Sequence, residues 1–127
     1  MAKAEKRRTK ARLPGQVATT LRAAGDKQAT DVAVLDLRKA AGFTDYFVIC
    51  SGNNPRQIRA IADHVIETLR EQGAKPSHIE GYDRSEWVLL DYFDFIVHIF
   101  TPETRTFYGL ERLWGNAETL DVDAAVS

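Results

Sequence analysis

The run Asp45–Ser51, with the sequence DYFVICS, restricts the fold more than any other segment of this chain. Its interior is apolar throughout and lacks the alternation that marks a strand with one solvated face. Runs of this kind occur in strands that are covered on both faces. The segment therefore predicts a central strand of a β-sheet.

Four further extended segments accompany this run. Thr30–Leu37 is rich in β-branched residues and alternates imperfectly between apolar and polar. Only a short turn-like stretch separates it from Asp45–Ser51, so the two strands are expected to pair antiparallel. Trp87–Asp91 and Phe95–Phe100 are joined by a short turn and should form a second antiparallel pair. A shorter extended piece is expected around His78–Tyr82.

The first two predicted helices flank the central strand. One spans Leu13–Ala24 and is expected to end at Gly25. The other begins at Pro55, behind the N-cap residue Asn54, and ends near Gly73. Its apolar residues follow the helical period in one unbroken stripe, which comprises Ile58, Ile61, Ala62, Val65, Ile66 and Leu69.

A last helix is predicted to start at Pro102 after the N-cap Thr101, with Phe107, Leu110 and Trp114 on its buried side. The resulting order of elements contains too few crossovers for an all-parallel sheet. We therefore expect an α/β fold in which a mixed sheet of about five strands has helices packed on it.

The length of 127 residues and the hydrophobic content of 44% suit one packed core and are too small for two. The predicted domain covers residues 13–117, between a basic tail at 1–12, expected to be disordered, and a flexible C-terminal tail at 118–127. Six basic residues and one acidic residue give the first 13 positions a charge of +5, which leaves −6 for the rest because the total is −1. A tail of this charge is attracted to phosphate, so contact with RNA is the functional alternative to a merely solvated terminus.

The sequence contains no apolar run near the roughly 18 residues that a membrane span needs, and no apolar core follows the basic start. A soluble, cytoplasmic protein is expected. Cys50 is the only cysteine, which excludes an internal disulfide and a zinc site built on a cysteine pair. It is expected to be a small core residue, and His98 a half-buried, hydrogen-bonded side chain.

Two short clusters allow a catalytic interpretation. Ser51, Gly52 and Asn53 lie between a strand and a helix N-terminus, where backbone N–H groups can hold a phosphate, although a turn with a helix cap explains the same residues. Asp91 and Asp94 could bind a divalent metal, although a third carboxylate at ligand spacing is missing and aspartates commonly open turns. A nucleotidyltransferase-like, metal-dependent enzyme is therefore the alternative function.

The aromatic and charged residues near the C-terminus fit a protein interface better than a catalytic site. Trp87, Asp91, Arg105, Tyr108 and Glu111 are of the types that form interface hot spots and their polar rims. Trp87 opens a strand directly after a polar run, and a strand end lies near solvent. This group predicts a surface that binds a partner.

The same residues belong to a set of ordered blocks between Asp45 and Trp114, within a stretch of similarity that covers roughly Leu13–Ala117. The blocks are Asp45–Gly52, Arg56 with Gln57, Ala60–Ala62, Glu80 with Gly81, Trp87–Asp91, Asp94, Val97–Phe100, Arg105, Tyr108, Leu110 with Glu111, and Leu113 with Trp114. In this order they resemble the ribosomal silencing factor family, the RsfS or Iojap-like proteins. So many ordered blocks in one short domain are far more specific than a single motif.

The resemblance implies a fold similar to nucleotidyltransferases without their catalytic residues, and so a binding protein that is not an enzyme and needs no cofactor. Family members bind the large ribosomal subunit through large-subunit ribosomal protein fourteen, block its joining to the small subunit and repress translation. The partner-binding residues implied here are Trp87, Asp91, Asp94, Arg105, Tyr108 and Glu111. Contact of the basic tail with ribosomal RNA, and a homodimer through a shared apolar edge, are compatible with the sequence.

Two positions depart from the family pattern. Phe93 stands in the turn before Phe95–Phe100, where relatives usually have glycine, and phenylalanine tolerates a positive φ poorly. Pro55 stands where a small polar residue is more usual, but the first turn of a helix accepts proline. We expect Phe93 to be the point at which the predicted surface differs from its relatives.

Overall fold

The computed structural model describes residues 13–120, and its strands form one six-stranded mixed sheet. In chain order the elements are α2 (Gly15–Asp26), β1 (Thr30–Asp36), β2 (Tyr46–Ser51), α3 (Pro55–Glu71), β3 (His78–Glu80), β4 (Trp87–Asp91), β5 (Phe95–Phe100), α4 (Pro102–Tyr108), α5 (Leu110–Leu113) and β6 (Glu118–Leu120). The strand order is β3-β4-β5-β2-β1-β6. Strands β2 and β5 pair in parallel and all other neighbours pair antiparallel. The α/β class, the two antiparallel pairs and the central position of β2 are thus confirmed.

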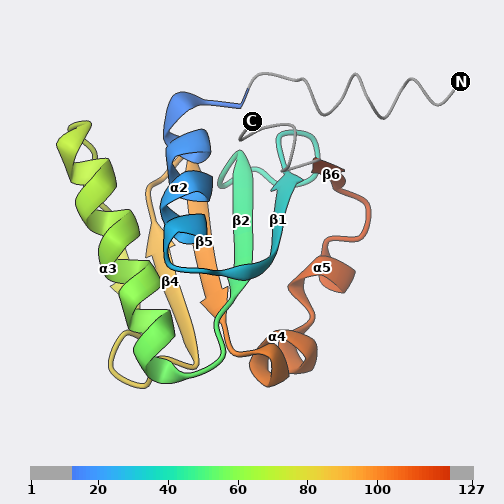
Figure 1. Ribbon diagram of the computed structural model, residues 1–127. Helices are drawn as coiled ribbons and strands as arrows, with labels where there is room; N and C mark the ends of the chain where they lie inside the picture. The colour runs from blue at the N-terminus through green and yellow to red at the C-terminus, as the bar shows by residue number, and fades with distance from the viewer. Residues whose placement is uncertain (1–12, 121–127) are drawn as a thin grey trace, which may run out of the picture.

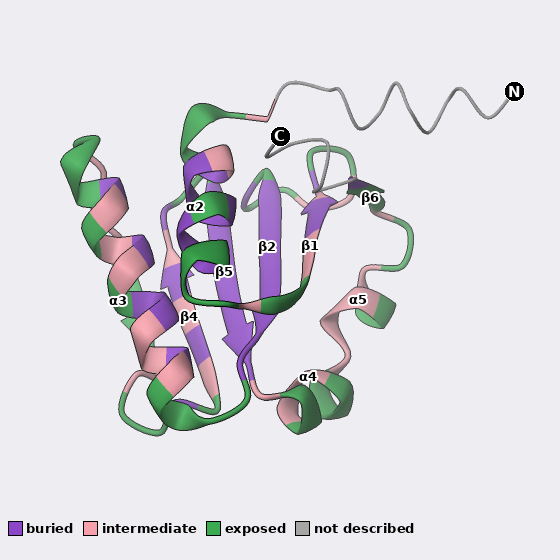
Figure 2. Cartoon of the chain, in the orientation of Figure 1, coloured by how far each residue is buried: buried purple, intermediate pink, exposed green. Residues whose placement is uncertain are grey.

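The two faces of the sheet are covered differently. Helices α2 and α3 lie side by side over one face (Figure 1), where their apolar stripes and the strands beneath them form the larger core. A smaller core on the opposite face contains no residue of either helix; it comprises Leu35, Leu37, Phe47, Ile49, Ile96 and Phe100. Strands β2 and β5 are buried between the two cores (Figure 2). Within residues 13–120, no helix combines the length and apolar character needed to cross a membrane.

Helix α3 begins as its sequence predicts. The side chain of Asn54 accepts a hydrogen bond from the backbone N–H of Gln57 at 2.9 Å, and Pro55 occupies the first helical position. The apolar stripe is buried against the sheet except for Ile66, which is half-buried. The N-cap fixes where this helix begins, and the buried apolar stripe fixes which of its faces lies on the sheet.

Helix α2 continues past the glycine that was expected to end it. Gly25 lies inside the helix, which ends at Asp26. The chain leaves the helix at Gln28, which takes a left-handed φ of 64°, and Ala29 then donates its N–H to the carbonyl of Ala24 at 3.1 Å. Gln28 therefore fills the role that Gly25 was predicted to have.

The predicted last helix is two short helices. Gly109 adopts a left-handed conformation with φ 59°, which ends α4 and separates it from α5. Leu110 and Trp114 pack on the smaller core, as expected. Phe107 was predicted to be buried with them, but its side chain is 77% exposed because the bend breaks their common helical face.

The ordered sheet extends beyond the predicted end of the domain. Residues 118–120, assigned from sequence to a flexible tail, form strand β6 on the outer edge of β1. Leu120 pairs with Val34 and is 7% exposed, so it buries apolar area that holds the strand in place. The basic tail at 1–12 and the remainder of the C-terminal tail lie outside the described residues.

Candidate functional site

The face of the sheet opposite α2 and α3 carries a continuous series of aromatic rings, which we call the aromatic face. In order the rings are Phe43, Trp114, Phe47, His98, Trp87, Tyr108 and Phe107. Neighbouring ring centroids lie between 4.5 and 6.1 Å apart, which is the range of favourable tilted and edge contacts. The series links the loop before β2 to helix α4 across the middle of the sheet.

Trp87 and His98 form the centre of this face. Trp87 is the first residue of β4, and His98 lies in the middle of the neighbouring strand β5. The indole Nε1 donates a hydrogen bond to His98 Nδ1 at 3.0 Å, and the Trp87 ring also packs on Phe100 with centroids 4.8 Å apart. The position of the indole is therefore fixed by both packing and a hydrogen bond.

His98 is neutral in this arrangement. Burial lowers its pKa to about 3, since the ring is only 3% exposed and a charged imidazole loses its solvation there. Because Nδ1 accepts from Trp87, the proton of the neutral ring is on Nε2, which is buried without a hydrogen-bond partner in residues 13–120. His98 is therefore more buried than the sequence predicted and supports Trp87 rather than exchanging protons with solvent.

Both ends of the aromatic face are exposed to solvent. Phe43 is 57% exposed at one end, and Tyr108 is 50% and Phe107 77% exposed at the other. Apolar side chains scattered singly on a surface need no explanation, but several large ones around one sheet face are typical of a binding surface. The aromatic face is thus anchored at its centre and open at its edge.

The two candidate metal ligands lie in a turn, to which Asp91 contributes its side chain and Asp94 its backbone. Asp91 Oδ1 accepts a hydrogen bond from the backbone N–H of Phe93 at 2.8 Å, and Asp94 donates its N–H to the carbonyl of Tyr92 at 2.9 Å. Asp94 is exposed, and its carbonyl accepts from the N–H of Asp45. In the part of the chain that the structure describes, no group of three or more His, Cys, Asp or Glu side chains is arranged to hold a metal.

Phe93 keeps the backbone conformation that suits glycine. Its φ is 79°, and the hydrogen bond from Asp94 to Tyr92 closes a tight γ-type turn around it. Its carbonyl accepts from the hydroxyl of Thr44 at 2.9 Å, and its side chain is 75% exposed. The turn therefore retains its shape with a strained residue and presents a phenyl ring to solvent.

The segment Ser51–Asn53 also forms a turn and a helix start. Gly52 donates its N–H to the carbonyl of Phe100 at 2.9 Å, and Asn53 donates its N–H to Gln57 Oε1 at 2.7 Å. These backbone donors are therefore engaged within the chain. The turn interpretation of this segment is confirmed, and a phosphate would have to displace both hydrogen bonds.

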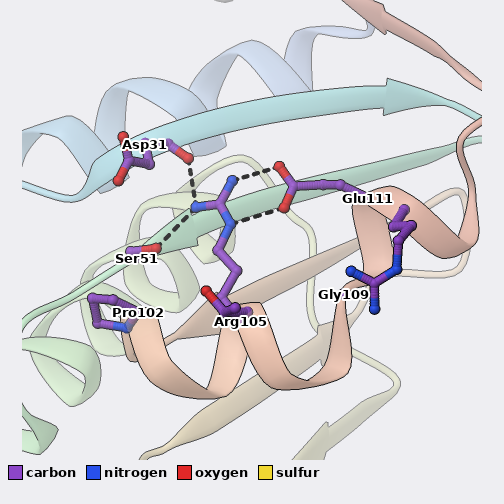
Figure 3. Close-up of a pocket in the computed structure, with 8 residues that line it drawn as sticks. Asp31, Ser51, Pro102, Arg105, Gly109 and Glu111 are labelled. Atoms are coloured by element: carbon purple, nitrogen blue, oxygen red, sulfur yellow. Dashed lines mark hydrogen bonds and ion pairs between the residues drawn. The ribbon is translucent and has the colours of Figure 1, made fainter.

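Arg105 lies in a hollow between α4, α5 and the ends of two strands (Figure 3). Its Nε and Nη2 bind both carboxylate oxygens of Glu111, at 3.0 and 2.7 Å. Its Nη1 donates to the carbonyl of Asp31 at 2.6 Å and to the hydroxyl of Ser51 at 2.9 Å. The adjacent guanidinium lowers the pKa of the Glu111 carboxyl below its usual range.

The structure divides the predicted contact residues into three pairs. Trp87 and Tyr108 touch, with ring centroids 4.7 Å apart, and Arg105 and Glu111 are bound to each other. Asp91 and Asp94 lie at the far end of β4, which places Asp91 about 13 Å from Trp87 along the strand. The sequence did not indicate Phe43 or Phe47 as parts of the same surface. Phe47 was hidden in an apolar run, and Phe43 lies in a turn that carries no periodic signal.

Comparisons with known proteins agree on one family. A family model described as "Ribosomal silencing factor during starvation" matches residues 10–127. The chain is 41% identical to the ribosomal silencing factor RsfS of Bacillus subtilis over 101 residues, which cover 80% of this chain and 86% of that protein. It is 32% identical to the mouse protein named "Mitochondrial assembly of ribosomal large subunit protein 1" over 91 residues, which cover 69% of this chain and 40% of that protein. A crystal structure of a Chromobacterium violaceum protein has the same fold, with a TM-score of 0.78 and 32% identity over 80% of this chain and 84% of that one.

Proposed function

Because the chain belongs to the ribosomal silencing factor family, we propose that it binds the large ribosomal subunit, keeps that subunit from joining the small one and so represses translation. The observation that carries this proposal is the contact between Trp87 and Tyr108. An indole held by His98 and half-covered by an exposed tyrosine is the kind of rigid aromatic anchor that dominates protein interfaces.

The partner on the subunit is proposed to be large-subunit ribosomal protein fourteen. Ribosomal proteins are generally basic, and the chain after its first 13 residues carries a net charge of −6. Asp94 is exposed and Asp91 is half-buried at the end of β4, so both can attract a basic partner towards the aromatic face. Occupying the surface at which the subunits meet then excludes the small subunit by volume alone.

We infer that this function involves no catalysis. His98 is neutral and buried, and burial raises the pKa of the Cys50 thiol to about 12. Asp91 binds the backbone of its own turn. A nucleotidyltransferase-like enzyme would have to use the Ser51–Asn53 turn and the carboxylates of Asp91 and Asp94, and the backbone donors of Gly52 and Asn53 are engaged within the chain as well. Calorimetry with ATP and Mg²⁺ would detect such an activity by heat of binding.

The basic tail is proposed to touch ribosomal RNA near the docking position, since its charge attracts phosphate without reading sequence. A cytoplasmic location is also proposed, because the proposed partner is the ribosome. Both statements depend on the binding described above.

Sedimentation of ribosomal subunits tests the proposal directly. Purified large subunits mixed with the protein should carry it into their peak on a sucrose gradient. Adding small subunits at a Mg²⁺ concentration that normally permits joining should leave the two subunit peaks separate. Failure to co-sediment, or full joining at saturating protein, would refute the proposed function.

A further inference from the structure

Arg105 and Glu111 were predicted to contact the partner, but both are already engaged within the chain. The Arg105 side chain is only 13% exposed and makes hydrogen bonds to three other residues. Both carboxylate oxygens of Glu111 are bound by the guanidinium, in the two-pronged geometry that gives arginine its directional strength. Little of the Arg105 guanidinium remains to meet another molecule, and the Glu111 carboxylate, although its side chain is 41% exposed, is committed to Arg105 through both oxygens.

The carbonyl that Arg105 binds comes from an irregularity in β1. The pairing of β1 with β2 shifts register between Thr30 and Ala33, and Asp31 there takes a left-handed φ of 50°. A bulge of this kind leaves a backbone group without a partner in the sheet. Arg105 supplies that partner at 2.6 Å and so fastens α4 to the edge of the sheet.

The ion pair also spans the bend between the last two helices. Arg105 lies on α4, Glu111 lies on α5, and the left-handed Gly109 separates them. Tyr108 is the residue immediately before the bend, three positions from each partner of the ion pair. A bond across the bend restricts the angle between α4 and α5, and Tyr108 is the last residue of α4, directly beside that bend.

We propose that Arg105 and Glu111 are positioning residues: their ion pair closes the α4–α5 bend and holds the Tyr108 ring on Trp87. They shape the docking surface without touching the partner. The effect on ribosome binding rests on the proposed function, whereas the effect on Tyr108 does not. Arg105 therefore links a bulge in β1 to the aromatic face.

Tryptophan fluorescence tests the positioning itself. The chain has two tryptophans, so the Trp114→Phe background leaves Trp87 as the sole reporter. In that background, Arg105→Gln and Glu111→Gln should each move the Trp87 emission to longer wavelength, and Tyr108→Ala should do the same, because in each variant the indole loses its cover. Arg112→Gln is the control, since Arg112 is an exposed arginine next to Glu111 on α5.

Affinity for purified large subunits is then measured with Trp114 intact. Arg105→Gln and Glu111→Gln should each weaken binding by about fivefold or more, as expected when a hot-spot aromatic is displaced. In a Tyr108→Ala chain they should add little, since the ring that they position is gone. Glu111→Gln leaves the bonds of Arg105 to Asp31 and Ser51 in place, so it tests the bend even if Arg105→Gln does not fold.

The outcomes separate this proposal from the proposed function. If the emission of Trp87 is unchanged in both variants, the ion pair does not hold Tyr108 and the proposal is wrong. Weaker binding without an emission change would mean that Arg105 and Glu111 contact the partner directly. An emission change with unaltered affinity would show that the position of the Tyr108 ring does not matter for docking. If the unmodified chain does not bind large subunits, the proposed function fails while the fluorescence result still decides the positioning role.

Discussion

Trp87 Nε1 donates a hydrogen bond to His98 Nδ1 at 3.0 Å, across two neighbouring antiparallel strands. The bond makes a half-buried indole and a buried imidazole depend on each other. Trp87 gains a fixed orientation at the surface, and His98 gains a partner for one of its two nitrogens. The stability of the fold and the shape of the docking surface are therefore coupled at this pair.

Trp87→Phe should lower the free energy of unfolding by about 1–3 kcal/mol, because it leaves the buried Nδ1 of His98 without a donor. Urea unfolding followed by circular dichroism measures the change. Trp114→Phe is the control, since that indole packs edge-on against Phe47 and makes no such bond to His98. An equal loss in both variants would mean that ring volume matters and the hydrogen bond does not.

Stability should fall as the pH drops below about 6.5. The pKa of His98 is about 3 in the folded chain and near 6.5 when unfolded, so between these values the unfolded state binds more protons. The contribution of His98 to the free energy of unfolding is complete above pH 6.5 and decreases by up to about 1.4 kcal/mol per pH unit as the pH falls towards 3. Unfolding curves between pH 7 and 4.5 should show this slope in the unmodified chain. His98→Gln, which keeps an acceptor for Trp87, should remove it, and an unchanged slope would assign the effect to other groups.

Tyr108→Ala should weaken binding to the large subunit by about 1–2 kcal/mol with little loss of stability, because half of the ring is already in solvent. Equilibrium sedimentation with labelled protein gives the affinity. Ile79→Ala is a suitable control, since Ile79 is 45% exposed but pairs with Leu90, on the face that carries α3. Equal effects of the two substitutions would argue against the aromatic face as the docking surface.

Phe93→Gly should raise the free energy of unfolding by about 1 kcal/mol. A side chain at φ 79° costs on the order of 1–3 kcal/mol, and glycine removes this strain while losing part of the gain to its greater freedom in the unfolded chain. Phe93→Ala retains the Cβ and should stay close to the unmodified chain. Thermal melts of the unmodified chain and the two variants measure these differences. If Phe93→Ala stabilises the protein and Phe93→Gly does not, the energetic cost lies in the exposed ring and not in the backbone.

Deleting residues 1–12 should reduce the salt dependence of ribosome binding. These residues contain six lysines and arginines, so the slope of log K against log salt should fall by up to about four for contacts with single-stranded RNA. Binding measured across a range of KCl concentrations gives the slope. An identical slope with and without the tail would remove it from the contacts.

Regular elements were predictable where one period dominates the sequence. Strands β4 and β5 and the start of α3 follow from alternation, an apolar run and an N-cap, which are all local signals. The contact of Arg105 with Asp31 joins residues 74 positions apart and depends on a bulge that no local pattern announces. The bend at Gly109 could not be predicted from the sequence either, because a glycine inside a helical pattern is compatible with both a continuous and a broken helix. The core could therefore be predicted in outline from the sequence, but the geometry of the site could not.

Strand β6 gives the C-terminal segment a protective role. It occupies the outer edge of β1 through the pairs Val34 with Leu120 and Leu35 with Thr119. An unpaired strand edge is a template for joining another chain. Shortening the protein at Ala117 would uncover this edge and invite strand-to-strand aggregation, so any tag or truncation for laboratory work should leave residues 118–120 intact.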